Sequence, residues 1–328
     1  MKIISCLRPF IGFDEYPLYL ELLKLDPTLI NFDDRLFRYY FTNSYLQKIA
    51  RKISHAKIRN DFNQMLISYL KSYKPDLFIC FNTPLLSSDV FDYLPSGCRS
   101  IMLYPDLDPT VHGSDFMLAL SKFDLLFHTK KNLKDKFSSI NSNSVCINTL
   151  YSAINHKFVC EKAISTFHNP AIVAHYSENK LDLLNSFARD LDFQIDVYGS
   201  NWPKNKIQNI NFNQSVFGPP VIDIYRDSLF TIGLLQDKLT KNGVGDVLTS
   251  RSYLVPLSGG LLVHQDNNYA RQLYGSKFEL FFENSHDLNR AFEVLQDPNY
   301  RREQMRFQLD SVLANSVSVQ SFVEDYVL

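Results

Sequence analysis

Short apolar runs alternate along this chain with longer amphipathic stretches, and this alternation constrains the fold more than any other feature. Each run is rich in Ile, Leu, Val or Phe and is bounded by Pro, Asn, Asp or Gly. Such a pattern is typical of βα units that build a parallel sheet. The strands expected in the first half are Lys2–Cys6, Asp76–Phe81, Arg99–Tyr104, Asp124–Thr129 and Ser144–Leu150.

The same pattern restarts in the second half, after a mixed, weakly periodic stretch over residues 151–169. The chain has 328 residues, which is room for two domains. We therefore expect α/β domains over residues 1–155 and 156–312, then a C-terminal helix, 313–328, that packs back on the first. The strands expected in the second domain are Ala171–His175, Phe193–Tyr198, Leu229–Leu234, Gly260–His264 and Phe278–Phe282.

Helices are expected wherever apolar residues recur at three- and four-residue spacing. The longest covers residues 44–73, and Pro75 follows its end. The others expected are Glu178–Asp190, Val221–Asp227, Asp246–Val255, Ser285–Leu295, Asn299–Leu313 and Val317–Val327.

Composition excludes several classes of protein. The net charge is −1, so no global field draws the chain to nucleic acid. No apolar run approaches the roughly 20 residues that span a bilayer, and Met1–Cys6 leads directly into a strand-like run, so we expect a cytoplasmic protein. The five cysteines form no C-x-x-C pair, which favours reduced thiols over zinc or disulfides.

Glycine-rich signatures narrow the choice of nucleotide chemistry. Neither G-x-x-x-x-G-K-[ST] nor G-x-G-x-x-G is present, which disfavours a P-loop enzyme and a dinucleotide dehydrogenase. The most informative segment instead runs from Asp246 to Arg302. It holds an arginine within a helical pattern, a Ser-Gly-Gly turn, an apolar strand, a Phe-Phe pair before an acidic helix, and a Leu-Gln-Asp-Pro ending.

This order of motifs resembles the donor-binding domain of GT-B glycosyltransferases, and in particular the spore-maturation-protein (CgeB-like) family. The strand end at residues 197–202 (Val-Tyr-Gly-Ser-Asn-Trp), the Phe-Gly turn at 217–218, and the Pro-Asp positions at 75–76 and 105–106 are also similar. The resemblance covers most of the chain. It implies two Rossmann-like, doubly wound domains that face each other across a cleft.

The resemblance also implies a donor site that binds a nucleotide sugar as substrate, with no cofactor and no essential metal. Glycine allows close approach of the main chain to a diphosphate, and arginine offers a fork of donors to phosphate oxygens. The simpler alternatives are a helix C-cap at Gly259–Gly260, a solvated Arg251 and a core role for Trp202. The expected donor-binding residues are Tyr198, Gly199, Trp202, Gly218, Asp246, Thr249, Arg251, Gly259 and Gly260.

A general base is expected in the loop that follows the strand ending at Tyr104. Asp106 is the first candidate because it matches the Asp position of the family, and His112 is the second because histidine titrates in the useful range. The alternative for Asp106 is a role in an Asp-Pro turn. Arg8 and Gly12 follow the first strand and are expected to border the acceptor.

One departure from the family concerns the donor sugar. Many retaining GT-B enzymes carry a glutamate three residues after the arginine-like position, and Leu254 stands there, with Asp266 the nearest acid downstream. We expect a metal-independent glycosyltransferase of cell-surface polysaccharide synthesis, acting on a glycan or lipid-linked acceptor. The alternatives are a GT-B sugar-nucleotide epimerase and a non-catalytic sugar-nucleotide or glycan-binding protein.

The long helix over residues 44–73 is basic in its first half. Its cations could rest on an anionic membrane, which would place the protein at the inner face, or they could simply be solvated. The basic residues are Lys48, Arg51, Lys52, His55, Lys57 and Arg59.

Overall fold

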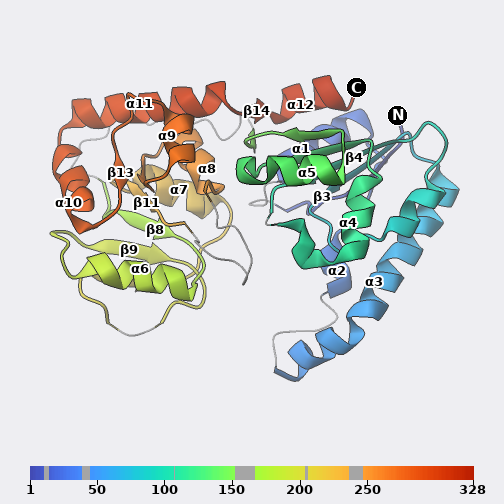
Figure 1. Ribbon diagram of the computed structural model, residues 1–328, viewed down its shortest axis with the longest axis horizontal. Coiled ribbons are helices and arrows are strands. Elements are labelled where there is room, and N and C mark those ends of the chain that lie inside the picture. Colours follow the sequence, from blue (N-terminus) through green and yellow to red (C-terminus); the bar gives the residue numbers. More distant parts are fainter. Residues whose placement is uncertain (11–14, 39–44, 107, 152–166, 204–205, 236–246) are drawn as a thin grey trace. The chain divides into compact units, whose positions relative to one another are not determined.

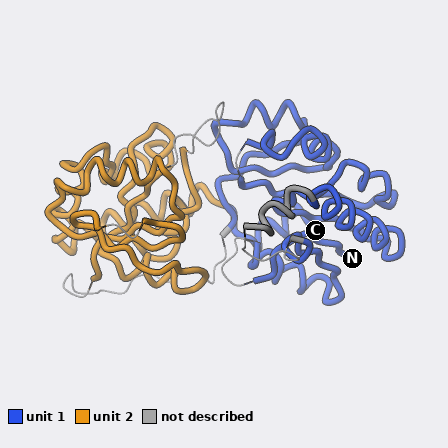
Figure 2. The backbone as a smooth tube through the Cα atoms, turned by 90° about the horizontal axis from the view of Figure 1, so that it is seen from below, with its two compact units in different colours: residues 1–150, 317–328 blue, residues 151–316 orange. Residues whose placement is uncertain are grey.

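The chain forms two compact units, each described here by itself (Figure 2). Unit 1 comprises residues 1–150 and 317–328, and unit 2 comprises residues 151–316. The computed structural model describes residues 1–10, 15–38, 45–106, 108–151, 167–203, 206–235 and 247–328.

Unit 1 is built on a parallel sheet with strand order β2-β1-β3-β4-β5-β6. Its central strands are buried along nearly their whole length because helices cover both faces of the sheet. Cys6 of β1 pairs with Cys80 of β3, which fixes the register of the two central strands. The strands are β1 (Ile3–Cys6), β2 (Ile30–Asn31), β3 (Leu77–Phe81), β4 (Arg99–Tyr104), β5 (Leu125–His128) and β6 (Ser144–Cys146).

Alternate strand residues of unit 1 enter two separate cores. Ile4 and Phe78 belong to the core that includes residues of α3, α4 and α5, whereas Ile3 and Leu77 belong to the core that includes residues of α1 and α12. Figure 1 shows these helices around the sheet. The helices are α1 (Tyr16–Leu25), α2 (Asp34–Arg38), η1 (Ser88–Tyr93), α3 (Tyr45–Tyr73), η2 (Pro109–His112), α4 (Ser114–Ser121), η3 (Lys131–Leu133), α5 (Lys134–Ile140) and α12 (Val319–Tyr326).

Unit 2 repeats this plan with strand order β10-β9-β8-β11-β12-β13, again parallel. The edge strand β10 is largely exposed, whereas β11 is fully buried. The strands are β8 (Ala171–Val173), β9 (Ile195–Tyr198), β10 (Ile210–Asn213), β11 (Thr231–Gly233), β12 (Leu262–Gln265) and β13 (Phe281–Phe282).

The helices of unit 2 begin at strong local signals. The side chains of Ser177, Asn267, Asn284 and Asp297 each accept a hydrogen bond from a main-chain N–H in the first turn, as N-cap residues do. The helices are α6 (Glu178–Ala188), α7 (Pro219–Asp227), α8 (Arg251–Leu257), α9 (Asn268–Tyr274), α10 (Ser285–Val294) and α11 (Pro298–Ala314).

The chain returns to unit 1 after α11. A two-stranded ladder joins β14 (Val317–Ser318) to β7 (Leu150–Tyr151), and α12 follows it. Phe322 of α12 is fully buried, with its ring centroid 5.0 Å from that of Phe127 on β5. The last helix therefore supplies part of the core of unit 1.

The ten strands expected from the sequence are all present, mostly one to three residues shorter. The structure adds β2 and β10, which are short or polar, and divides the expected strand 144–150 between β6 and β7. It also adds the helices α1, α2, α4, α5 and α9. The helix expected over 246–255 begins only at Arg251; Asp246 lies outside the described residues.

Truncation of Phe322 tests the role of the tail. Phe322→Ala should lower the free energy of unfolding of unit 1 by about 3–5 kcal/mol, because a fully buried aromatic ring is lost. Urea denaturation followed by circular dichroism measures this loss. The exposed neighbour Gln320→Ala should change it by less than about 0.5 kcal/mol. Equal effects of the two substitutions would contradict the packing of α12 on the sheet.

Candidate functional site

The sheet of unit 2 changes direction between β8 and β11. Strands β9 and β10 follow β8 on one side, and β11, β12 and β13 lie on the other. Doubly wound sheets bind ligands at the carboxyl ends of the strands beside such a switch point. The described residues directly after β8 and β11 therefore define the candidate donor site.

Arg251, the first residue of α8, lies at this switch point. Its Nη1 donates to the carbonyl oxygen of Val173, the last residue of β8, at 3.2 Å. Its Nη2 donates to the carbonyl oxygen of Leu234, directly after β11, at 2.8 Å. Two of the five guanidinium N–H groups thus join the strand ends on either side of the switch point, and the cation itself is fixed at the candidate donor site.

The turn after β9 lies against the end of β8. A Cβ on Gly199 would stand 1.8 Å from the carbonyl oxygen of Ala174, so only glycine fits there. The same oxygen accepts a hydrogen bond from Trp202 Nε1 at 2.7 Å. The Trp202 ring packs edge-on against exposed Tyr176 and stacks on Phe212, with centroid distances of 5.8 and 5.7 Å. Trp202 therefore anchors the core and also forms part of an aromatic surface at the edge of the sheet.

A second contact joins the same two loops. His175 Nδ1 lies 2.7 Å from the Ser200 hydroxyl, and the Tyr176 N–H donates to the Ser200 carbonyl oxygen. We did not single out His175 and Ser200 from the sequence, although each lies two residues after a strand that ends at this edge. Their position after adjacent strands was the available signal.

The other expected donor residues lie at separate places in unit 2. Tyr198 is the last residue of β9; burial, and secondarily Asp196, raises the pKa of its phenol. Gly218 is the N-cap of α7, with a φ of 73°. Prolines follow it at the first two helical positions, so this helix end offers fewer N–H donors. Thr249 lies before α8, and its N–H donates to the Ser252 hydroxyl.

Gly259 and Gly260 cap the C-terminus of α8. The Gly260 N–H donates to the Val255 carbonyl and the Gly259 N–H to that of Pro256, which is a Schellman motif with Gly259 at a φ of 76°. A Cβ on Gly260 would lie 2.4 Å from the Tyr225 carbonyl oxygen. This cap precedes β12 at the amino edge of the sheet, opposite Arg251. The simpler alternative, a helix C-cap, therefore describes how these glycines are used in the fold, and their contact with a phosphate stays a prediction.

A buried histidine lies next to the first turn of α8. The Ser252 hydroxyl and His264 Nε2 are 2.9 Å apart, and His264 Nδ1 is 2.6 Å from the Gln265 carbonyl oxygen. Burial lowers the pKa of His264 to about 4; the Gln265 carbonyl opposes this shift and nearby Arg251 adds to it. His264 is therefore neutral at physiological pH and holds the helix that carries Arg251.

The structure also shows the surroundings of Leu254, which stands where many retaining GT-B enzymes carry a glutamate. Leu254 packs against the apolar core of unit 2, and Asp266 forms an ion pair with Arg271. These positions hold a core residue and a paired acid.

Unit 1 has its own switch point, between β1 and β3. Arg8, two residues after β1, points its Nε at Asp34 and Glu15, at 3.4 and 3.6 Å. Both acids are buried, with 5% and 2% of the residue exposed. Gly12, the other residue expected at the acceptor, lies outside the described residues.

Asp106 follows β4 at the same edge, and the amide nitrogen of Asn82 donates to its carboxylate at 3.1 Å. Asn82 follows β3 directly and has a φ of 41°, a strained conformation for a residue other than glycine. We did not predict this partner from the sequence. The hydrogen bond from Asn82 holds the Asp106 carboxylate at the carboxyl edge of the sheet.

His112, the second candidate base, and the neighbouring acid Asp108 both contact residues that hold the structure of this loop. The ring of His112 packs edge-on against Tyr104 and Phe116 at centroid distances of 6.1 and 5.1 Å. Asp108 pairs with Lys136 and caps η2 by accepting from Thr110. Burial would raise the pKa of Asp108, but the hydrogen bonds from Lys136 and Thr110 outweigh it and lower the pKa. Asp108 thus shapes the loop that presents Asp106.

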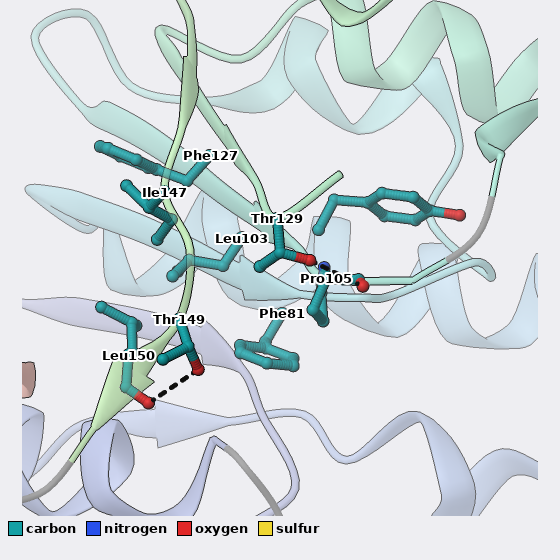
Figure 3. Close-up of a pocket in the computed structure, with 9 residues that line it drawn as sticks. Phe81, Leu103, Pro105, Phe127, Thr129, Ile147, Thr149 and Leu150 are labelled. Atoms are coloured by element: carbon teal, nitrogen blue, oxygen red, sulfur yellow. Dashed lines mark hydrogen bonds between the residues drawn. The ribbon is translucent and has the colours of Figure 1, made fainter. Parts of the chain in front are cut away.

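A small pocket opens beside Asp106 at the carboxyl ends of β3, β4 and β5 (Figure 3). Its volume is about 40 Å³. Phe81 and Pro105, which directly precede Asn82 and Asp106, form part of its wall. The lining is completed by Leu103, Tyr104, Phe127, Thr129, Ile147, Thr149 and Leu150.

Over the residues that the structure describes, no three His, Cys, Asp or Glu side chains gather into a group that could hold a metal ion. Among the described helices, none combines the length and the apolar character needed to cross a membrane. On α3, the described residues His55 and Lys57 are exposed.

Comparison with known proteins bears directly on unit 2. Residues 180–321 match the model of a family described as glycosyl transferase-like. This stretch includes nearly all of unit 2 from α6 onward, Arg251 among it, and reaches into α12. No curated protein matches the sequence.

Solved structures show a similar fold over the whole chain. An alpha-glucosyltransferase in complex with UDP and a 13-mer DNA is 11% identical, with a TM-score of 0.64 and 99% and 98% of the two chains covered. A UDP-GlcNAc 2-epimerase from Neisseria meningitidis bound to UDP-GlcNAc is 13% identical, with a TM-score of 0.57 and full coverage of both chains.

A third structure is the α,α-trehalose 6-phosphate synthase from Burkholderia multivorans, which is 13% identical, with a TM-score of 0.58 and 99% and 95% coverage. These likenesses confirm the predicted fold class, an α/β protein of two Rossmann-like units as in GT-B glycosyltransferases.

The buried histidines predict an acid-labile fold. Burial lowers the pKa of His264 to about 4, and that of His128 at the end of β5 also to about 4. The unfolded state, with an ordinary histidine pKa near 6.5, therefore binds more protons below that pH. The free energy of unfolding should be unaffected above pH 6.5 and fall by up to roughly 3 kcal/mol per histidine as the pH drops toward 4.

Urea denaturation at several pH values measures this slope. His264→Asn should remove about half of the loss between pH 6.5 and 4, because His128 still contributes. The exposed histidine at position 286 gives the control, and His286→Asn should leave the slope as it is. A slope unchanged in His264→Asn would show that His264 does not titrate as its burial requires.

Proposed function

We propose that this protein is a glycosyltransferase that moves a sugar from a nucleotide-sugar donor to a hydroxyl acceptor. The observation that carries the proposal is a coincidence of two findings in unit 2. The stretch that matches the glycosyl transferase-like family is also the stretch that places Arg251 at the switch point of the sheet.

The donor is assigned to the carboxyl edge of unit 2. Its diphosphate would lie at Arg251, whose positive charge stabilises the negative charge that develops as the nucleotide departs. Tyr176 and Trp202 supply aromatic surface at the neighbouring strand ends, suited to a base or ribose. Stabilisation of the leaving group by protein side chains is the basis for proposing a reaction without an essential metal.

The acceptor is assigned to the carboxyl edge of unit 1. Asp106 would remove the proton of the acceptor hydroxyl as the new glycosidic bond forms. The amide of Asn82 donates a hydrogen bond to this carboxylate and so orients it. His112 is the weaker candidate because its ring packs among aromatic side chains.

A second candidate function is sugar-nucleotide epimerisation, because UDP-GlcNAc 2-epimerases share the fold along the whole chain. A binding protein without turnover is the third, and Leu254 is the residue that favours it. The three differ in products. A transferase releases the nucleoside diphosphate only with an acceptor, an epimerase changes the sugar without an acceptor, and a binding protein does neither.

The finer expectations about biology belong to the same proposal. These are membership in the CgeB-like family, an acceptor of the cell-surface polysaccharide kind, and work in the cytoplasm at the inner face of the membrane. The exposed Lys57 on α3 supports the last point through its position and charge.

Ligand-induced stabilisation is the first test of the donor assignment. The melting temperature is measured with nucleoside diphosphates and nucleotide sugars of each base, with and without magnesium. One nucleotide family should stabilise the fold by about 2.7 kcal/mol at one hundred times its dissociation constant, without need of magnesium. A folded protein that responds to no nucleotide would reject the donor site, and release of nucleoside diphosphate with an acceptor then separates the three functions.

Substitution of Asp106 tests the base. Asp106→Asn keeps the shape of the side chain and removes its basicity, so kcat should fall about 100- to 10,000-fold while nucleotide affinity stays the same. The control is Asp92→Asn, which changes an exposed acid on η1 and should leave kcat as in the wild type. A full rate in Asp106→Asn would assign the base elsewhere.

A further inference from the structure

The pocket beside Asp106 is apolar and largely shut off from solvent. Of its wall residues, Phe81, Leu103, Phe127 and Ile147 are each at most 8% exposed. They belong to the core that α1 and α12 cover, so the pocket is a small indentation in a packed hydrophobic core. Figure 3 shows these side chains around the strand ends, with Thr129 and Thr149 among them.

The hydroxyls of the two threonines in the lining are already used, and Tyr104, the remaining polar side chain, belongs to the other core, which includes residues of α3, α4 and α5. The Thr129 hydroxyl donates to the Pro105 carbonyl oxygen at 3.0 Å, and the Thr149 hydroxyl donates to that of Leu150 at 3.3 Å. The hydroxyl hydrogen of each threonine is therefore already donated to a main-chain carbonyl oxygen. A hydroxyl or charged group in the pocket would lose its hydrogen bonds to water and gain little in return, whereas an apolar group loses nothing.

Size limits the occupant further. A water molecule needs about 10–15 Å³ by the same measure, so 40 Å³ admits a group of about three non-hydrogen atoms. A sugar ring and a lipid chain are both too large. The occupant that fits the volume and the chemistry is a methyl group at the edge of a larger molecule.

We propose that this pocket is a specificity subsite that receives a methyl substituent of the acceptor sugar. The inference rests on the proposed function, because it takes Asp106 as the base that faces the acceptor hydroxyl. The chain continues directly from the pocket wall to the base and its partner, at Pro105–Asp106 and Phe81–Asn82. A methyl group in the pocket would therefore anchor the sugar ring beside Asp106. Two kinds of sugar carry such a group, a 6-deoxy sugar and an N-acetylated amino sugar.

The preference can be measured with free sugars as probes, because the natural acceptor is not needed. The full chain is labelled with ¹³C in its Leu, Ile and Val methyl groups, and the signals of Leu103, Ile147 and Leu150 are followed by NMR. The probe pairs are L-fucose against L-galactose and N-acetylglucosamine against glucosamine; xenon serves as an apolar reference. One methyl-bearing sugar should perturb these signals with at least about tenfold higher affinity than its partner without the methyl.

Two substitutions at the rim make the test specific. Thr149→Ile adds a methyl group of the protein to the pocket and should abolish the response to the sugar. Thr149→Val has nearly the volume of threonine and should retain it. Melting curves of both variants establish that they are folded, so a lost response in Thr149→Ile reports occupancy of the pocket.

Every outcome decides the proposal. A response to fucose identifies a 6-deoxy sugar and a response to N-acetylglucosamine an N-acetylated one. A response to xenon alone shows a packing void, and equal responses within each pair, or none, also overturn the subsite. The signals of Val173 and Leu234 report nucleotide binding in the same sample. A nucleotide response without a methyl response rejects the subsite and keeps the proposed function, whereas a methyl response without a nucleotide response rejects the donor assignment on which the proposed function rests.

Discussion

Parallel strand pairing is the constraint on which the rest of this structure depends. A parallel pair cannot be closed by a tight turn, so every strand must be followed by a crossover before the next one begins. All carboxyl ends in a sheet then meet at one edge. Groups far apart in the sequence become neighbours there, as when Arg251 reaches the carbonyl oxygen of Val173, 78 residues earlier.

The two units use this edge in different ways. In unit 2 it is closed by main-chain contacts: Arg251 joins the ends of β8 and β11, and Gly199 brings β9 close to Ala174. A rigid, positively charged edge of this kind suits a diphosphate. In unit 1 the edge is acidic and held by side chains, with Asn82 on Asp106. This edge suits the activation of a hydroxyl, which requires a fixed carboxylate.

Much of the fold could be predicted from the sequence, because strands buried on both faces must be continuously apolar. Leu77–Phe81 is an example, and the apolar run Ile101–Tyr104 marks β4 in the same way; both strands were predicted to within one residue. The edge strands β2 and β10 were missed because neither contains a continuous apolar run. Strand β2 has only two residues, and the sequence of β10 is polar. Helices α4 and α5 were missed because eight and seven residues give only two turns of periodicity.

The residues of the candidate sites can be divided in the same way, into what the sequence located and what only the structure brought together. The sequence by itself determined the two α/β units and the residues that follow each strand, Asp106 and Gly199 among them, because local apolar runs and turn residues set where strands end. Only the tertiary structure decided which of these residues meet. It put Arg251 at the switch point and Gly259–Gly260 in a helix cap at the opposite edge, although Gly259 is only eight positions after Arg251. It also paired Asn82 with Asp106, because partners across a sheet edge are set by strand order, and no local pattern in the sequence records that order.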